Sequence, residues 1–288
     1  MNPPIHSARR RVLQSLAMAA AALPFMSHGK ERTMRRVFIT GSTDGLGRGA
    51  AETLISEGHQ VVLHARTKER ASALKDLAPR AAGVVVGDLS SAAQTRALAE
   101  QVNKLGRMDA VIHNAGIFRV PNRSPTADGH AGVLAVNVLA PYLLTRLIER
   151  PERIVYLSSS MHRGGEGPLD DIDWKTRSWD TYRAYSESKL YVTALAFAVA
   201  QRWPQVYSNA VDPGWVPTKM GGSGAPDDLE EGHLTQAWLA TSDDAAAKTS
   251  GGLWYHRARQ KPAAQSLEPR FQDELMEKLA ELTGVKLF

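Results

Sequence analysis

A chain of 288 residues with 43% hydrophobic residues is long enough to bury one large α/β core or two small ones. It has no cysteine, which excludes disulfides, thiolate metal ligands and a cysteine nucleophile, and no HExxH, EF-hand or paired-histidine spacing, so we expect no metal. The net charge of +5 comes almost entirely from residues 1–33, and the rest has no basic stripe interleaved with aromatics, so we expect no nucleic-acid partner.

Residues 1–33 are predicted to be a leader outside the fold. Its segment 8–26 (ARRRVLQSLAMAAAALPFM) joins a basic start to an apolar run too short to cross a bilayer core of ~30 Å, so we expect no stable membrane span. Arg9-Arg10 resembles a twin-arginine export signal, although no clear A-x-A cleavage site follows. Alternatively, MRRVFITG at Met34 is an ordinary start for a dinucleotide-binding protein. We favour this start and a cytoplasmic protein, with export as the alternative.

From Arg36 onward, short β-branched apolar runs alternate with helical patterns. Strands are expected at 36–40, 60–65, 83–88, 110–114, 153–159, 206–212 and 252–256. Helices are expected near 46–57, 67–77, 90–105, 129–150, 179–203 and 268–283. Because the strands are continuously hydrophobic, helices should cover both faces of the sheet. We therefore predict an α/β fold in which residues 34–288 form a single Rossmann-type domain with a doubly wound parallel sheet.

The stretch FITGSTDGLGRGA (38–50) follows the first strand and opens the first helix. Its frame is Gly41-x-x-x-Gly45-x-Gly47. Gly41 would allow a tight exit from the strand, Gly45 would let the backbone approach a pyrophosphate on the helix N-terminus, and Gly47 would permit close packing. A plain strand-to-helix turn is the alternative.

The second strand ends His64-Ala65-Arg66, without the acidic residue that usually binds the ribose 2′-hydroxyl of NAD. Arg66, with Lys68 nearby, offers a cation for a 2′-phosphate, so NADP(H) is preferred over NAD(H). The alternative is an arginine that is merely solvated.

Irregular stretches at 160–178 and 213–232 follow strands, at the carboxyl edge where such sheets bind ligands. The first precedes a long helix with Tyr185 and Lys189 four residues apart, hence on one helical face. This spacing alone is weak evidence, but it occurs together with Ser159 at a strand end and Asn137 in the preceding helix.

Together these motifs resemble the short-chain dehydrogenase/reductase family from Met34 to about Arg257. The matching pieces are TGSTDGLG (40–47), Asp88-Leu89, HNAG (113–116), Asn137, SSS (158–160), YSESK (185–189) and PGWVPT (213–218). The long gap between the serines and the tyrosine is similar to that of the NADP-dependent branch containing retinol dehydrogenases and WW-domain oxidoreductases.

The resemblance implies that Tyr185 is the general acid/base and that Ser159 hydrogen-bonds the substrate oxygen, with Ser160 as the alternative. Lys189 would bind the nicotinamide ribose and lower the tyrosine pKa, and Asn137 would hold the water of a proton relay. The cofactor contacts implied are Gly41, Ser42, Asp44, Gly45, Leu46, Gly47, Arg66, Asp88, Leu89, Asn114, Ala115, Gly116, Tyr185, Lys189, Pro213, Gly214, Val216 and Thr218.

Two departures from the family pattern, His113 and Asp212, are expected to leave the catalytic set untouched. For Tyr185, proton transfer near neutrality needs a pKa ~3 below the ~10 of free tyrosine, about 4 kcal/mol. An ammonium at ~4 Å in a partly desolvated cleft can supply ~4 kcal/mol.

We therefore predict an NADP(H)-dependent oxidoreductase acting on a small carbonyl or alcohol. A non-catalytic NADP-binding sensor and an extended-branch epimerase or dehydratase are the alternatives. An apolar pocket that suits a lipophilic substrate is expected from Trp215, Met220, Leu229, Met161 and His162. The oligomeric state is left open, a homo-oligomer included.

Overall fold

One sheet organises the part of the chain that the structure, a computed structural model, describes: Met1 and residues 33–288. Residues 34–288 form one compact unit. Within it, eight strands lie in the order β3-β2-β1-β4-β5-β6-β7-β8. The export signal predicted within residues 8–26 lies outside the described residues.

The seven predicted strands are all present and run parallel, which confirms the doubly wound α/β fold. They are β1 (Arg36–Ile39), β2 (Gln60–Ala65), β3 (Gly83–Val86), β4 (Ala110–His113), β5 (Arg153–Leu157), β6 (Tyr207–Val211) and β7 (Leu253–Tyr255). The side chains of β1 point alternately to the two faces of the sheet, because successive side chains of a strand lie on opposite sides. Val37 and Ile39 join one apolar cluster and Phe38 joins another.

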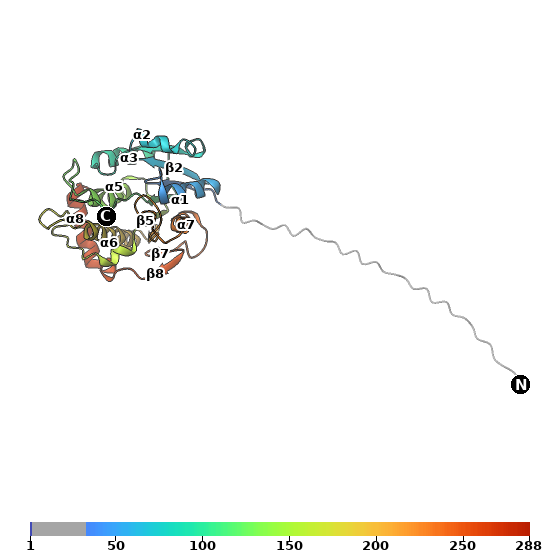
Figure 1. The fold of residues 1–288 in the computed structure, drawn as a ribbon. Coiled ribbons are helices and arrows are strands. Elements are labelled where there is room, and N and C mark those ends of the chain that lie inside the picture. Colours follow the sequence, from blue (N-terminus) through green and yellow to red (C-terminus); the bar gives the residue numbers. More distant parts are fainter. Residues whose placement is uncertain (2–32) are drawn as a thin grey trace. The chain divides into compact units, whose positions relative to one another are not determined.

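Helices cover both faces of the sheet (Figure 1). On one face lie α1 (Gly45–Ser56) and α7 (Leu229–Thr241). The other face carries α3 (Ala92–Lys104), α5 (Ala140–Leu147) and α6 (Thr181–Arg202), and α8 (Pro269–Thr283) packs on α6. Most of α6 is buried because it lies between the sheet and α8. The predicted helix at 268–283 is thus present.

An antiparallel edge strand, β8 (Ala258–Gln260), was not predicted. It pairs with β7 through a two-residue turn in which His256 and Arg257 both have positive φ, +46° and +61°. Asparagine and glycine are the residues that usually mark such a turn. Their absence removed the sequence signal for a hairpin.

Helix α7 was also missed, because the irregular stretch predicted at 213–232 ends in its first turn. Its buried residues lie all around the helix, so it lacks the one-sided apolar stripe that identifies a helix in sequence. It also carries Gly232, where a side chain would press against Val216.

Two predicted helices are interrupted. The segment predicted at 67–77 contains α2 (Lys68–Ala71) followed by 3-10 turns, and it buries only Leu74 and Leu77. The segment predicted at 129–150 consists of α4 (Gly132–Leu134), a π-helical turn η3 (Ala135–Leu139) and α5. The π turn carries Asn137, so the interruption lies at a predicted site residue.

The parallel strands all end at one edge of the sheet, so the residues that follow β1, β2, β4, β5 and β6 are brought together there. Helix α6 starts beside this edge, and the carboxylate of Asp180 caps it by accepting from the backbone N–H groups of Tyr182 and Arg183. Among residues 33–288, no helix combines the length and apolar character needed to cross a membrane.

The end of β4 generates a prediction about acid stability. His113 is buried, with its Nε2 3.1 Å from Thr145 Oγ1, and burial lowers its pKa to about 3. In the unfolded chain its pKa is ~6.5. Its contribution to stability is therefore complete above ~6.5 and is lost as the pH falls from there towards 3. Between pH 7 and pH 5 this amounts to about 2 kcal/mol.

We expect His113→Gln, which cannot titrate, to lose about 2 kcal/mol less unfolding free energy than the parent chain between pH 7 and pH 5. Urea unfolding curves at the two pH values measure the difference. Parallel losses in parent and variant would contradict the assignment of a neutral buried histidine.

Candidate active site

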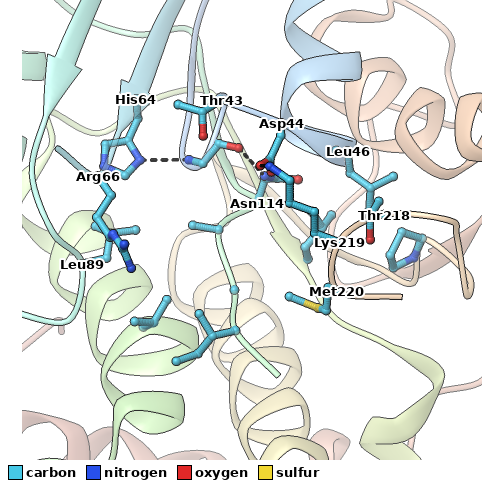
Figure 2. A pocket seen from close by; sticks show the side chains of 18 of the residues that line it. Thr43, Asp44, Leu46, His64, Arg66, Leu89, Asn114, Thr218, Lys219 and Met220 are labelled. Atoms are coloured by element: carbon cyan, nitrogen blue, oxygen red, sulfur yellow. Dashed lines mark hydrogen bonds and ion pairs between the residues drawn. The ribbon is translucent and has the colours of Figure 1, made fainter. Parts of the chain in front are cut away.

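A cavity of about 490 Å³ opens along the carboxyl edge of the sheet (Figure 2). Most of the predicted site residues line it: Gly41, Asp44, Gly45, Leu46, Arg66, Asp88, Leu89, Asn114, Ala115, Gly116, Tyr185, Lys189, Pro213 and Thr218. Ser42, Gly47, Asn137, Ser159, Gly214 and Val216 are not among its lining residues.

The turn between β1 and α1 depends on its glycines. Gly41 and Gly45 have φ values of +69° and +55°, in the left-handed region that side chains disfavour. A Cβ on Gly47 would overlap the carbonyl oxygen of Gly41 and the side-chain nitrogen of Asn114. Gly47 thus packs against the turn itself and against the residue after β4.

The N-terminus of α1 faces the cavity without a side-chain cap. Asp44 occupies the cap position, yet its carboxylate makes no capping bond and instead accepts from Lys219 Nζ at 2.6 Å and from Arg70 at 3.0 Å. Partial burial of Asp44 opposes ionisation, but these two cations together hold its pKa below the usual value. The negative charge is therefore already matched by cations on the wall of the cavity.

The end of β2 brings a free cation to the cavity. Arg66 is exposed and lines the cavity, and it makes no hydrogen bond or ion pair with any residue in the described part of the chain (Figure 2). Arg70, one turn further along, also lines the cavity and was missed by sequence reasoning. Lys68 does not line it. No local pattern identified this second cation, because Arg66 precedes Thr67, the cap residue of α2, and the helical spacing of four does not apply to it.

A buried histidine, His64, holds the glycine turn in place and was also missed. The N–H of Gly41 donates to His64 Nδ1 at 2.9 Å, and His64 Nε2 lies 2.8 Å from the carbonyl oxygen of Gly87 (Figure 2 shows His64 beside the turn). Because Nδ1 accepts, Nε2 must carry the proton and donate to Gly87. A single histidine in an otherwise continuous apolar strand gave no hint of this role.

The segment after β4 is tied to the same turn. Asn114 donates to the carbonyl oxygens of Thr40 and Gly41, at 2.9 and 3.3 Å, and Ala115 N–H donates to Thr40 Oγ1 at 3.0 Å. A Cβ on Gly116 would come within 3.5 Å of Lys189 Nζ. The two segments therefore form one continuous wall from the glycine turn to the buried lysine.

The three predicted catalytic side chains meet at the end of β5. Lys189 Nζ donates to the carbonyl oxygen of Leu157 at 2.8 Å, and it lies 5.5 Å from the ring centroid of Tyr185. The Ser159 side chain lies close enough to the Tyr185 hydroxyl to lower the pKa of the tyrosine, and Ser159 Oγ accepts from the backbone N–H of Met161 at 3.3 Å. The neighbouring serine, Ser158, is buried and also lines the cavity, and its hydroxyl is paired with Thr193 Oγ1 at 2.6 Å.

The pKa of Tyr185 departs from the sequence expectation. Burial raises the pKa of Tyr185 to about 12. The Ser159 side chain lowers this pKa, and the negative charge of Asp212 raises it. Burial also lowers the pKa of Lys189 to about 8, with Asp212 opposing. The expected lowering of the tyrosine pKa by Lys189 is thus absent in the protein alone, because loss of hydration of the phenolate dominates. Asp212, expected to be uninvolved, acts on both groups.

Asn137 is committed to a neighbouring segment. Its Oδ1 accepts from Ile117 N–H at 2.8 Å, and its Nδ2 donates to the Ile117 carbonyl oxygen and to Ser188 Oγ, both at 3.0 Å. The side chain therefore fixes Ile117 against α6. Its role in holding a relay water stays a prediction.

The expected substrate pocket is only partly formed by the residues named for it. Met220 lines the cavity, whereas His162 is fully buried. Two aromatic rings outside the cavity lining lie near Tyr185: the centroid of Phe118 is 4.3 Å from that of Tyr185 and 5.4 Å from that of Tyr182. Tyr182 and Trp215 are 58% and 56% exposed. Among the described residues, no group of three or more metal-ligating side chains occurs.

Comparisons with known proteins agree with this geometry. A sequence model of a family described as enoyl-(acyl carrier protein) reductase matches residues 41–247. The short-chain dehydrogenase chyC of Penicillium rubens is 41% identical over 259 residues, which cover 88% of this chain and 99% of that protein. Human retinol dehydrogenase 13 is 32% identical over 201 residues, 65% of this chain and 60% of its own length. The structure of a gluconate 5-dehydrogenase from Burkholderia cenocepacia, in complex with NADP and tartrate, matches with a TM-score of 0.60 at 22% identity, over 78% of this chain and 94% of that one.

The packing of Gly47 generates a prediction. Gly47→Ala places a methyl group on backbone and on a tied side chain, so we expect it to lower the free energy of unfolding by about 1–3 kcal/mol, despite the better helix propensity of alanine. Gly224→Ala is the matched control, since nothing lies within 4 Å of the added carbon, and its effect should stay within about 0.5 kcal/mol. Chemical unfolding measures the free energy of unfolding of both variants. Equal values for Gly47→Ala and Gly224→Ala would contradict the prediction, because they would mean that the turn adjusts to the added methyl group without loss of stability.

Proposed function

The chain belongs to the short-chain dehydrogenase/reductase family, and from that premise we propose that it is an NADP(H)-dependent oxidoreductase that interconverts a lipophilic carbonyl compound and its alcohol. When bound, the cofactor supplies or accepts the hydride. The observation that carries this proposal is the meeting of Ser159, Tyr185 and Lys189 beside a cavity that starts at the N-terminus of α1. A module that only senses NADP would not need these three groups together.

The residues present fit a dinucleotide. The uncapped N-terminus of α1 offers backbone N–H groups and a positive dipole end to a pyrophosphate, and Gly45 leaves room for its close approach. Asp44 would repel a phosphate if it were unpaired, but Arg70 and Lys219 neutralise it. Leu89 and Asp88 line the end of the cavity where the adenine would lie, and Lys189 and Thr218 line the end suited to the nicotinamide and its ribose.

The free guanidinium of Arg66 supports NADP(H) over NAD(H). Nothing in the described part of the chain occupies this cation, and it lines the cavity next to Leu89. A guanidinium suits a phosphate because its N–H donors match the phosphate oxygens. Arg70, held by Asp44 and Thr43, provides a second positive charge nearby.

The environment of Tyr185 favours reduction. With a pKa of about 12, its hydroxyl stays protonated near neutrality. Reduction of a carbonyl produces an alkoxide, a stronger base than a phenolate, so proton transfer from Tyr185 is downhill. Ser159 would share the same oxygen through its hydroxyl. Oxidation of an alcohol would instead require the phenolate, which burial disfavours.

The aromatic surroundings of Tyr185 support a lipophilic, planar substrate. Phe118 contacts the Tyr185 ring, Tyr182 and Trp215 present exposed rings, and Met220 lines the cavity. Flat faces of this kind bind aromatic compounds by stacking and by burial of apolar surface. An aryl ketone or aldehyde is the class that these residues suit best.

A panel of aromatic and aliphatic ketones, followed by NADPH absorbance, tests the proposal. We expect aryl ketones to be reduced best. Tyr185→Phe should lower kcat by about 10²–10⁴-fold, because the proton donor is removed, while NADPH binding, followed by fluorescence, stays unchanged. Tyr207→Phe, at the start of β6 and outside the cavity lining, is the control and should retain kcat. A parent chain that reduces no member of the panel, or a Tyr185→Phe variant with parental kcat, would refute the assignment.

Cofactor choice gives a separate prediction. Arg66→Ala should reduce kcat/KM for NADPH by about 10–100-fold, the value of a charge-assisted hydrogen bond, and should change kcat/KM for NADH by less than about threefold. Lys68→Ala, two residues further on but outside the cavity lining, should leave both values near those of the parent. Equal effects on the two cofactors would show that Arg66 does not contact a 2′-phosphate.

A further inference from the structure

The buried histidine that follows the catalytic serine makes two bonds that the mechanism above does not use. Ser159 caps the 3-10 helix η4 (Ser160–Gly164), in which His162 is fully buried. His162 Nδ1 lies 2.6 Å from the carbonyl oxygen of Ser159, and Ala263 N–H donates to His162 Nε2 at 3.0 Å. The ring therefore connects the serine to a segment one hundred residues further along the chain.

These bonds determine the protonation of the ring. A backbone N–H can only donate, so Nε2 must accept from Ala263 and cannot carry a proton. The neutral imidazole then has its proton on Nδ1, which donates to the carbonyl oxygen of Ser159. Burial lowers the pKa of His162, which favours this neutral form, although the bond to Ser159 and the charge of Asp212 oppose the shift.

The carbonyl group of Ser159 thus has two donors from one residue. The backbone N–H of His162 donates to it at 3.1 Å, in addition to Nδ1–H. With the carbonyl held from two directions, the peptide plane after Ser159 cannot rotate freely. The side chain of the same residue acts on the pKa of Tyr185. Two donors on the carbonyl oxygen restrict displacement of the Ser159 backbone, which carries that side chain.

The other end of the ring is held by the C-terminal part of the chain. Ala263 precedes the 3-10 turn η5 (Ala264–Leu267), and Arg163 donates to the Lys261 carbonyl oxygen at 2.9 Å in the same region. This segment lies beyond residues 41–247, the range matched by the family sequence model. A part of the chain outside that range therefore supports the catalytic serine.

We propose that His162 is a positioning residue that holds Ser159 beside Tyr185 by donating from Nδ1 to the Ser159 carbonyl oxygen, in the tautomer that the Ala263 N–H group selects. The inference rests on the proposed carbonyl reduction, in which Ser159 binds the substrate oxygen. In this proposal the His162 ring transfers no proton to the substrate.

Two substitutions of His162 separate its two bonds. In His162→Asn the amide nitrogen can take the place of Nδ1 and keep the bond to Ser159, while the bond to Ala263 is lost. In His162→Gln the amide oxygen can take the place of Nε2 and keep the bond to Ala263, while the bond to Ser159 is lost. Each variant loses one bond, so a purely structural role would reduce Tm and activity alike in both.

We expect His162→Gln to lower kcat for the best aryl ketone of the panel by about 10–100-fold, with KM for NADPH unchanged, because a small misplacement of Ser159 affects the transition state more than cofactor binding. His162→Asn should stay within about threefold of the parent. His59→Gln, at a buried histidine whose Nδ1 accepts from Arg35 N–H, is the control and should lower Tm without changing kcat. Equal kcat losses in the Asn and Gln variants would overturn the inference.

Two further measurements keep the test decisive if the variants fold poorly. Ala263→Pro removes the N–H donor at a residue whose φ of −57° already suits proline. It removes the same bond as His162→Asn and leaves the bond to Ser159 in place, so kcat should stay within about threefold of the parent; a loss as large as that of His162→Gln would overturn the inference. In the parent chain, ¹⁵N-histidine NMR should show an Nδ1-protonated ring whose signal is lost in His162→Asn. If the signal lost in that variant belongs to an Nε2-protonated ring, the inference is overturned whether or not any ketone is reduced. A parent chain that is inactive on the whole panel refutes the proposed function instead.

Discussion

The buried ammonium of Lys189 is the constraint on which the site depends. A charge removed from water is strongly unfavourable unless it is hydrogen-bonded or paired. Lys189 meets this requirement by donating to the carbonyl oxygen of Leu157, the last residue of β5, within the field of Asp212. The bond fixes α6 against the end of β5. Tyr185, one turn earlier on α6, is thereby held beside Ser159, which follows β5 by two residues.

Two neutral histidines connect backbone segments around the site in the same way. His64 accepts from the N–H of Gly41 and donates to the Gly87 carbonyl oxygen; His162 accepts from Ala263 and donates to Ser159. Each ring joins a backbone donor to a backbone acceptor from separate segments, and each must remain in one tautomer to do so. The charged residues, by contrast, lie on the cavity wall, where Asp44 is neutralised by two cations and Arg66 is left free.

Sequence reasoning succeeded where the signal is local or periodic. The strands from β1 to β7 are continuous apolar runs, and α1 and α6 begin beside motifs whose spacing is fixed by helix geometry. It failed where neighbours decide the outcome. Helix α7 is buried all around, and β8 follows a turn made by His256 and Arg257 instead of asparagine and glycine. Arg70 escaped notice because its approach to Asp44 requires two separate segments to meet.

The sequence by itself determined the fold class, the glycine turn, the arginine after β2 and the identity of the three catalytic candidates. The fold class and the turn follow from the hydrophobic period and from the special backbone conformations of glycine. The three catalytic candidates were identified by the resemblance of the combined motifs to the family pattern. Only the tertiary structure decided how those groups behave. Three properties depend on which atoms are brought close together and removed from water: the pKa of Tyr185, the pairing of Asp44 and the anchoring of Ser159 through His162. A local sequence pattern specifies neither burial nor contacts between residues far apart in the chain.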